Sequence, residues 1–321
     1  MNVWLLPENV EDVLPPRAWR MEDMRRALLD LFRSRGYQLV VPPLMEYVDS
    51  LLTGVAADLD LKTFKVVDQL TGRLMGVRAD ITPQVARIDA HLLAANAVNR
   101  LCYAGSVLHT QADGFHRSRE PIQIGAELYG EAGAEADLEI LTLMLQGLSA
   151  CDVNSVQLDI GHVGVYRALA QEAKLSDDVE HQLFGALQAK DSSAVAVLTA
   201  GLSVALREAF AALPLLYGDR SVLAEARVRL PQLPAVQASL DTLDVLDRGL
   251  DQIEAAYDLA ELRGYGYHSG VVFAAYTGGR SHAIAQGGRY DEVGRVFGRA
   301  RPATGFSLDL RELAIVSSKS Q

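Results

Sequence analysis

The sequence predicts an α+β fold, in which an antiparallel sheet flanked by helices carries an inserted helical lobe. Residues 1–162 of the 321-residue chain contain several short β-type runs that pair as hairpins, with helices between them. Residues 163–253 are rich in Ala and Leu at helical spacing, and β-type runs return after residue 254. Because strands and helices do not alternate regularly, a doubly wound parallel sheet is not expected. We predict a discontinuous core, residues 1–162 and 254–321, interrupted by a helical insertion, residues 163–253.

The N-terminal part begins with a helix. Apolar residues recur at helical spacing over 17–35, and Gly36 is a suitable stop. A strand, YQLVVPP, follows, and two β-type runs, 63–67 and 74–78, flank the turn DQLTG and predict a hairpin. Pro83 can open a helix that extends to about residue 95.

A second strand pair, 99–109 and 121–130, is joined by a polar loop, and a helix over 135–148 leads to a strand at 155–162. In the insertion, Ser176 followed by acidic residues predicts a capped helix start. Three prolines, at 214, 231 and 234, should divide this stretch into separate helices. The last elements expected are strands within 256–262, 269–279 and 280–288, which should rejoin the first sheet, and a helix over 308–316.

Composition limits the class of protein. The net charge of -11 and the pI of about 5.1 are unfavourable for nucleic-acid binding, which depends on Lys and Arg. The two cysteines, Cys102 and Cys151, form no C-x-x-C pair, so a reducing compartment is expected. The N-terminus does not resemble a signal peptide, and no apolar run approaches the length of a membrane span. We therefore expect a cytoplasmic protein with no membrane contact.

Common catalytic and cofactor motifs are absent from the sequence. It contains no G-x-x-x-x-G-K-[ST] loop, no G-x-G-x-x-G after a strand and no G-x-S-x-G elbow. The seven histidines show neither an H-E-x-x-H pattern nor close pairing with cysteine. No catalytic residues, cofactor or metal site are predicted.

Polar residues instead gather in segments that otherwise have core character. Arg78, Asp80 and Thr82 end one strand, and Gln123, Gly125 and Glu127 share one face of another. Arg117 precedes the second of these strands, and further polar residues follow near the C-terminus, at Arg263, Tyr267 and 286–291. Acids can hold an ammonium group, and arginine can hold a carboxylate, so this set suits a zwitterionic ligand.

These segments resemble the histidyl-tRNA synthetases, a family of class II synthetases. ELRGYGYHSGVVF is similar to the first histidine-specific motif of that family, and AQGGRYDEV is similar to the second. GYQLVVPPLMEY, SVLHTQADGFHRSREPIQIGAELYG and ATGFSLDLREL resemble class II motifs 1, 2 and 3. The resemblance extends over the whole chain and is weakest in the helical insertion. It implies a class II synthetase-like fold.

The resemblance also implies a histidine pocket. Asp80 matches the acid that holds the α-ammonium group, with Thr82 beside it, and Arg117 matches the second arginine of the motif 2 region. The remaining positions that match the pocket are Gln123, Glu127, Arg263, Tyr267, His268 and Tyr290. Tyr267-His268 replaces the Tyr-Tyr pair of the family, and Gly266 replaces its motif aspartate.

The departures from the family concern ATP. The motif 2 sequence Phe-Arg-x-Glu, which binds the α-phosphate and adenine, is replaced by Leu108-His109-Thr110-Gln111. The motif 3 arginine, which meets the γ-phosphate, is replaced by Glu312. Neither residue can substitute for a permanently charged guanidinium, and losing one such donor typically costs about 3–4 kcal/mol in the transition state. Histidine activation should therefore be abolished.

A retained histidine pocket with disabled ATP chemistry resembles the synthetase-like regulatory subunits of ATP phosphoribosyltransferase. This resemblance implies a short-form catalytic subunit as partner, histidine as effector, and a homodimer formed through motif 1, around 36–47. No C-terminal anticodon-binding domain and no tRNA binding are expected. One alternative remains open: a truncated histidyl-tRNA synthetase-like enzyme that forms histidyl-adenylate. An unrelated amino-acid ligase on the same sheet would lack the histidine-specific motifs, which are present.

Overall fold

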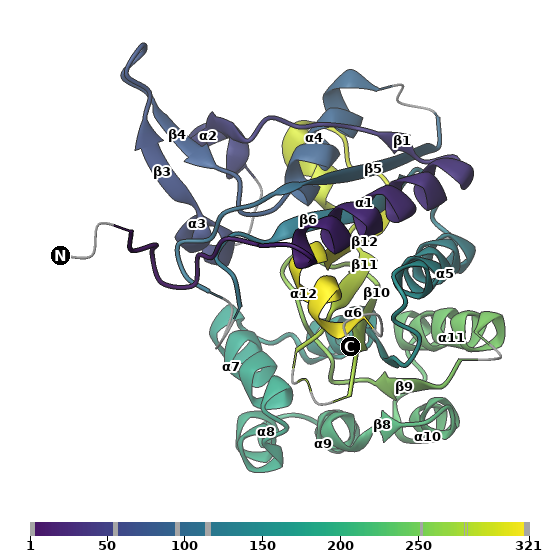
Figure 1. Ribbon diagram of the computed structural model, residues 1–321. Coiled ribbons are helices and arrows are strands. Elements are labelled where there is room, and N and C mark those ends of the chain that lie inside the picture. Colours follow the sequence, from purple (N-terminus) through teal and green to yellow (C-terminus); the bar gives the residue numbers. More distant parts are fainter. Residues whose placement is uncertain are drawn as a thin grey trace. The chain divides into compact units, whose positions relative to one another are not determined.

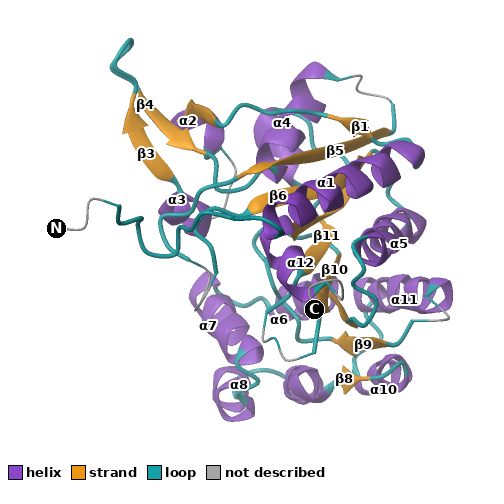
Figure 2. Ribbon diagram, in the orientation of Figure 1, coloured by secondary structure: helices purple, strands orange, loops and turns teal. Residues whose placement is uncertain are grey.

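The computed structural model describes most of the chain (Figures 1 and 2). The described residues are 4–53, 57–93, 97–112, 117–250, 253–278, 280 and 282–317. The chain divides into two compact units. The first unit comprises Met1–Glu131, Leu143–Asn154 and Asp291–Gln321, and the second comprises Ala132–Thr142 and Ser155–Tyr290.

The first unit is built on a mixed sheet with the strand order β1-β5-β6-β12. β5 (Asn99–Ser106) and β12 (Ala303–Asp309) flank β6 (Ile122–Tyr129), and both pair with it antiparallel. β1 (Gln38–Leu39) runs parallel to β5 at the edge. A separate three-stranded antiparallel sheet has β4 (Leu74–Val77) between β2 (Met45–Tyr47) and β3 (Phe64–Val67).

Helix α1 (Arg17–Ser34) covers one face of the four-stranded sheet. It buries Met21, Met24, Leu28 and Phe32 at helical spacing, and Phe32 meets Phe306 of β12 edge to face at 5.8 Å between ring centroids. Because side chains alternate along a strand, the residues next to Phe306 in sequence point to the opposite face. The other helices of this unit are α2 (Val48–Leu51), α3 (Ala57–Lys62), α4 (Thr82–Leu92), α12 (Leu310–Val316) and the short 3-10 helix η2 (Val293–Phe297).

The second unit contains a five-stranded sheet with the order β11-β10-β7-β9-β8. Its strands are β7 (Gln157–His162), β8 (Tyr217–Gly218), β9 (Ala255–Asp258), β10 (Val271–Tyr276) and β11 (Ala285–Arg289). β10 pairs antiparallel with β7 and β11, whereas β7 and β9 are parallel. The short β8 pairs antiparallel with β9 at the edge.

Most helices of the second unit lie between residues 163 and 249. They are α6 (Val163–Ala173), α7 (Asp177–Gln188), α8 (Ser192–Thr199), α9 (Val204–Ala212), α10 (Ser221–Arg229) and α11 (Pro234–Gly249), with a 3-10 turn, η1 (Leu213–Leu215). In Figure 1, α7 to α10 are the teal and green helices in the lower part of the picture, with α10 next to β8. Helix α5 (Ala134–Ala150) begins in the second unit and ends in the first.

The α+β class and most of the predicted elements are confirmed. Gly36 ends the first helix with φ +84°, in the left-handed region that glycine tolerates, and the predicted hairpin is β3–β4. β12, which was not among the predicted strands, pairs with β6. The predicted insertion, residues 163–253, stays a prediction. The boundaries of the two compact units lie at other residues.

Several details of the prediction are wrong. The last helix starts at Leu310 and not at residue 308, because β12 continues to Asp309 and the Asp309 carboxylate caps the helix by accepting from the Arg311 N–H at 2.9 Å. Ser176 lies at the N-cap position of α7, but its hydroxyl makes no capping hydrogen bond. Helix α4 ends at Leu92, where Leu93 becomes extended, and the expected last turn lies partly outside the described residues.

Candidate functional site

One face of the β5-β6-β12 sheet of the first unit is lined by polar side chains and glycines. In the antiparallel register, Gln123 lies opposite Asp309, and Glu127 lies opposite Gly305. Tyr103 of β5 lies opposite Gly125. Directly paired residues of antiparallel strands share a face. The predicted alternation of Gln123, Gly125 and Glu127 on one face is therefore confirmed, and it is the face opposite Phe306.

Gln123 connects this face to the segment before α4. Its amide nitrogen donates to Asp80 Oδ1 at 2.8 Å, and its amide oxygen accepts from the Ile81 N–H at 2.9 Å. Asp80 Oδ1 also accepts from the Thr82 N–H at 3.0 Å. Asp80 Oδ2 makes no hydrogen bond among the described residues, and Asp80 as a residue is partly exposed, so this oxygen can accept from a ligand.

Glu127 is held by a tyrosine that was not among the predicted site residues. The Tyr103 hydroxyl donates to Glu127 Oε1 at 3.0 Å and lies 3.1 Å from Thr82 Oγ1. Burial, together with the charges of Glu127 and Asp80, raises the pKa of Tyr103 well above its ordinary value, so the hydroxyl stays protonated as a donor. Glu127 itself is 1% exposed. Asp80, Thr82, Gln123 and Glu127 therefore belong to one hydrogen-bonded cluster.

The positions at which synthetases bind phosphate have other contacts here. The His109 ring nitrogen Nε2 donates to the Ala79 carbonyl at 2.8 Å. Glu312 is 4% exposed, and its charge helps burial to raise the pKa of Asp309 to about 6. Arg311, the neighbouring cation, donates to Glu120 at 3.2 Å and to the Glu11 carbonyl at 3.4 Å. These contacts do not provide a pair of cations for a triphosphate.

Two arginines of the predicted set have separate surroundings. Arg117 lies beside the segment 113–116, which is outside the described residues, and its charge acts on the Asp309 carboxyl. Arg78 is structural, because it donates to the carbonyls of Ser106 and Pro42, both at 2.9 Å.

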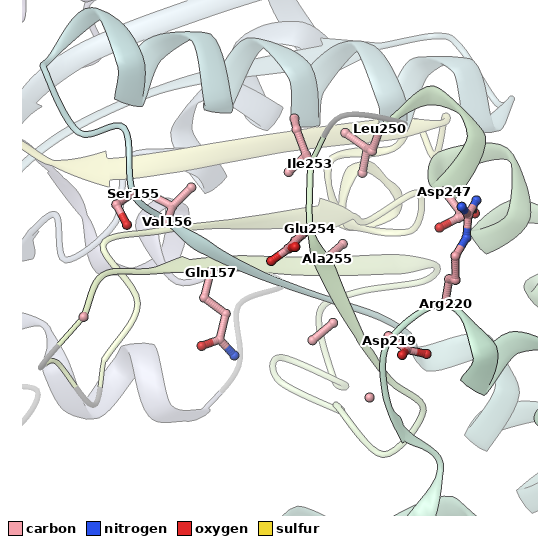
Figure 3. A pocket seen from close by; sticks show the side chains of 13 residues that line it. Ser155, Val156, Gln157, Asp219, Arg220, Asp247, Leu250, Ile253, Glu254 and Ala255 are labelled. Carbon is pink, nitrogen blue, oxygen red and sulfur yellow. The ribbon is translucent and has the colours of Figure 1, made fainter.

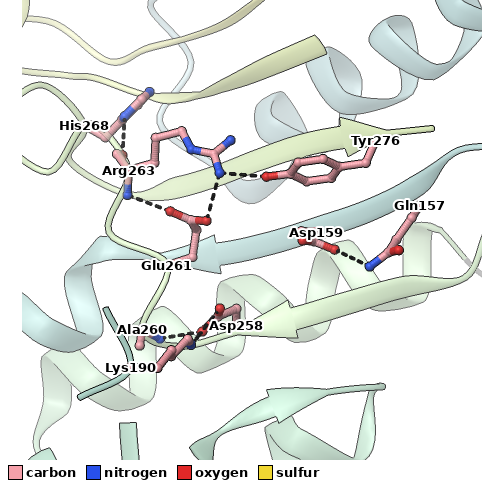
Figure 4. A network of polar contacts seen from close by, with 9 residues as sticks. All are labelled: Gln157, Asp159, Lys190, Asp258, Ala260, Glu261, Arg263, His268 and Tyr276. Atoms are coloured by element: carbon pink, nitrogen blue, oxygen red, sulfur yellow. Dashed lines mark hydrogen bonds and ion pairs between the residues drawn. The ribbon is translucent and has the colours of Figure 1, made fainter. Parts of the chain in front are cut away.

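In the second unit, Arg263 is the centre of a polar network (Figure 4). Its Nη2 donates to the Tyr276 hydroxyl at 2.6 Å and to Glu261 Oε2 at 3.3 Å. The Arg263 backbone N–H donates to the other oxygen of Glu261 at 2.8 Å. Burial opposes the charge of Arg263, but the Tyr276 hydrogen bond and Glu261 together raise its pKa, so the guanidinium stays charged.

A second carboxyl of this network is Asp159 of β7. It accepts from the Gln157 amide at 3.2 Å. Burial is the main cause that raises its pKa, and Asp258 and Glu261 add to the effect. A hollow of about 260 Å³ adjoins these groups and is lined by Gln157, Asp159, Tyr276, Thr277, Gly278 and Arg280.

The predicted aromatic residues lie close to one another in the same unit. The rings of Tyr267 and Tyr290 are 5.1 Å apart at an angle of 33°, and His268 contacts Tyr267 edge to face at 5.4 Å. The His268 ring nitrogen Nδ1 lies 3.2 Å from the Arg263 carbonyl. Burial lowers the pKa of His268 to about 4, so its imidazole is neutral near pH 7. Arg263, Tyr267, His268 and Tyr290 therefore belong to one neighbourhood.

A larger hollow, of about 1030 Å³, adjoins the hollow beside Asp159 and shares Gln157 and Gly278 with it (Figure 3). It is bounded by the starts of β7 and β9 and by the end of α11, and it is lined in part by Asp219, Arg220, Asp247 and Glu254. Arg220 and Asp247 pair with each other across this lining. None of the predicted site residues lines this hollow.

The described ranges contain no group of three or more His, Cys, Asp or Glu side chains arranged to hold a metal ion. None of the helices within those ranges is both long and apolar enough to cross a membrane. Cys102 and Cys151 are both free and buried.

Comparison with known proteins identifies the family. A family model described as histidyl-tRNA synthetase matches residues 9–313. An ATP phosphoribosyltransferase regulatory subunit from Thiobacillus denitrificans is 81% identical over 321 residues, which is 100% of both chains. The chain belongs to the ATP phosphoribosyltransferase regulatory subunit family. A second member, from Ralstonia nicotianae, is 61% identical over 99% of this chain and 82% of its own length.

Solved structures agree with this regulatory-subunit family and its synthetase-like fold. An ATP phosphoribosyltransferase regulatory subunit/histidyl-tRNA synthetase from Bacillus halodurans has a TM-score of 0.89 at 27% identity, over 98% of this chain and 84% of that one. A chain of the ATP phosphoribosyl transferase (HisG:HisZ) complex from Thermotoga maritima has a TM-score of 0.68 at 17% identity, over 90% and 97% of the two chains. At that identity, the likeness to the Thermotoga chain shows the fold alone.

For this member of the regulatory-subunit family, sequence reasoning missed three residues of the two clusters. Tyr103 lies in the run LCYAG and has the pattern of a core residue. Glu261 and Tyr276 lie in segments that were assigned only as strands or as part of a motif. The spacing Glu-x-Arg in ELR could have indicated a local ion pair, but no comparable local signal marks Tyr103 or Tyr276.

Proposed function

We propose that this chain activates a short-form ATP phosphoribosyltransferase catalytic subunit and senses histidine for feedback inhibition. Membership of the regulatory-subunit family, at 81% identity over the full chain, is the observation that carries the proposal. The Thermotoga complex, in which a similar fold accompanies an ATP phosphoribosyl transferase, supports the pairing with a catalytic subunit.

The cluster of the first unit supports an ammonium-bearing ligand. Asp80 keeps Oδ2 as an acceptor while Gln123 and the Thr82 N–H fix its other oxygen. The buried Glu127 carboxylate, held by Tyr103, adds a second negative group. An α-ammonium or an imidazole N–H can donate to a carboxylate oxygen such as Asp80 Oδ2.

The neighbourhood of the second unit supports a carboxylate-bearing ligand. Arg263 uses Nη2 for Tyr276 and Glu261, and its Nε and Nη1 make no hydrogen bond to any described residue. Its side chain is 40% exposed. A guanidinium with available N–H groups is a strong donor to a carboxylate. We therefore propose Asp80, Thr82, Arg117, Gln123, Glu127, Arg263, Tyr267, His268 and Tyr290 as the histidine-binding residues.

We also infer that this chain acts in the cytoplasm as a homodimer that joins the catalytic subunit in a closed hetero-oligomer, and that it does not bind tRNA. The net charge of -11 supports the last point, because tRNA binding depends on cationic surfaces. Two-fold units are the commonest components of closed assemblies.

The decisive experiment mixes this chain with a short-form catalytic subunit and measures co-elution and phosphoribosyltransferase activity with and without histidine. We expect one complex, a rate above that of the catalytic subunit alone, and inhibition by histidine. Histidine can act only through different affinities for the active and inhibited states, with a coupling of about 1–3 kcal/mol. Separate elution with unchanged activity would disprove the proposal.

The same preparation tests the adenylate-forming alternative. With His109 bonded to Ala79 and with the acidic Glu312 at the second phosphate position, no histidine-dependent ATP–pyrophosphate exchange is expected. Exchange above the level of a protein-free blank would favour an enzyme. Asp80→Asn should weaken histidine inhibition without changing co-elution, and Asp49→Asn, at an exposed carboxylate of α2, is the matched control.

A further inference from the structure

Glu261 fixes Arg263 from two directions. One of its carboxylate oxygens accepts from the Arg263 backbone N–H at 2.8 Å, and the other lies 3.3 Å from Nη2. The two residues are separated by one position in the turn after β9, so this carboxylate sets both the backbone and the side chain of Arg263. Figure 4 shows the two contacts converging on the same acid.

Tyr276 holds the far end of the same side chain from another strand. Its hydroxyl accepts from Nη2 at 2.6 Å, and the guanidinium carbon lies 5.9 Å from the centre of its ring. The ring also lines the hollow of about 260 Å³ beside Asp159. Since Tyr276 is paired in β10 with Gln157 of β7, its position is set by the sheet and not by Arg263.

This arrangement restricts a long, flexible side chain. An arginine that is free in solution loses rotamer freedom when it captures a carboxylate, and that loss weakens binding. The Arg263 side chain is restricted even without a ligand, because Glu261 and Tyr276 anchor its Nη2. Its Nε and Nη1 make no hydrogen bond to any residue of the described ranges, so they stay available to a ligand. The anchor therefore affects only ligands that have a group for Arg263 to bind.

We propose that Tyr276 and Glu261 are positioning residues for Arg263, and that they make histidine binding selective for the free carboxylate. This inference rests on the proposed histidine site. It assigns a chemical preference to the site. The contacts of Glu261 and Tyr276 with Arg263 strengthen the binding of histidine, and they do not strengthen the binding of an analogue that has the imidazole and ammonium groups but no carboxylate.

The test is calorimetry with histidine and with histamine, which lacks the carboxylate. Tyr276→Phe keeps the ring and removes only the hydroxyl. We expect it to weaken histidine binding about 10-fold, the equivalent of about 1.4 kcal/mol, and to leave histamine binding within about 2-fold. In an Arg263→Ala background, the same substitution should have no further effect on histidine, because the two changes remove one interaction.

A matched control is Tyr217→Phe, at a tyrosine of the same unit that is 52% exposed on β8. It should leave the affinities for both ligands unchanged. Should Tyr276→Phe fail to fold, as judged by its melting curve, Glu261→Ala removes the other part of the anchor. The same split between histidine and histamine is expected for that variant.

The outcomes separate the two proposals. If the unmodified protein binds histidine but the Tyr276→Phe variant binds it equally well, the positioning role is wrong and the proposed function stands. Equal weakening of histidine and histamine would show a general structural effect and would also overturn the positioning role. If the unmodified protein binds neither ligand, the histidine-sensing proposal fails, and this inference fails with it.

Discussion

Gly305 leaves the space that the Glu127 carboxylate occupies. A Cβ built at Gly305 would lie 1.5 Å from Glu127 Oε2 and 2.8 Å from the Ala126 carbonyl oxygen. Neither distance is compatible with a real side chain. In a Gly305→Ala variant, the Glu127 carboxylate must turn away and the β6–β12 pairing must shift locally.

The expected cost has two parts. Forcing one extra carbon into a packed interior typically costs about 1–3 kcal/mol. Turning the carboxylate also breaks its 3.0 Å hydrogen bond with Tyr103, and a hydrogen bond to a charged group is worth about 1.5–3 kcal/mol. Because the two effects overlap in one movement, we expect the free energy of unfolding to fall by about 2–5 kcal/mol. Histidine binding should weaken with it.

Urea denaturation and calorimetry with histidine measure the two effects. Gly185→Ala in α7 is the control, because a Cβ there would meet nothing within 4 Å. That substitution should stabilise the protein by up to about 1 kcal/mol through helix propensity. A neutral surface change alters the free energy of unfolding by no more than about 0.5 kcal/mol. If the change for Gly305→Ala were that small, and the variant bound histidine with unchanged affinity, Gly305 would not be needed to make room for the Glu127 carboxylate.

Three further results are expected. Burial lowers the pKa values of His162 and His268 to about 4, so these rings take up protons in the unfolded chain before they do so in the folded one as the pH falls. The free energy of unfolding should therefore decline between pH 6.5 and 4, by up to about 3 kcal/mol for each ring. His162→Gln should make this decline shallower in melting curves recorded at several pH values. Arg289→Met should destabilise the protein by about 3–5 kcal/mol in urea titrations, since it removes the cation that pairs with the buried Asp137 carboxylate at 3.0 Å; an unchanged midpoint would contradict this. Tyr103→Phe should weaken histidine binding about 10-fold in calorimetry by releasing Glu127, and equal affinities would argue against a role for that hydroxyl.

The sequence allowed prediction where the signal is local. Helical spacing and Gly36 predicted α1 and its end, and alternation along β6 placed Gln123 and Glu127 on one face. Both are properties of neighbouring residues, so the pattern survives in the linear sequence. The same reasoning missed the Asp309 cap, because LDLREL has apolar spacing suited to a helix that starts at residue 308.

The contacts that complete the two clusters are not local. Tyr103 reaches Glu127 across 24 positions, and Arg263 reaches Tyr276 across 13 positions and a change of strand. A tyrosine in an apolar run has the same pattern whether its hydroxyl meets water or a buried acid. Only the register between strands decides, and register is a tertiary property.

The hydrogen bond between the His109 ring and the Ala79 carbonyl bears on how the chain could acquire the phosphate-binding residues of the synthetases. Histidine and arginine codons can differ by one nucleotide, so the arginine of the synthetase motif is one mutation away at position 109. An arginine there would replace the ring that donates to the carbonyl of the residue just before Asp80, so the change would act beside the cluster proposed to bind histidine. Glu312 would still occupy the second phosphate position. Both positions would therefore have to change before the chain had the two phosphate-binding arginines of the synthetases, and the first change alone would act on the histidine cluster.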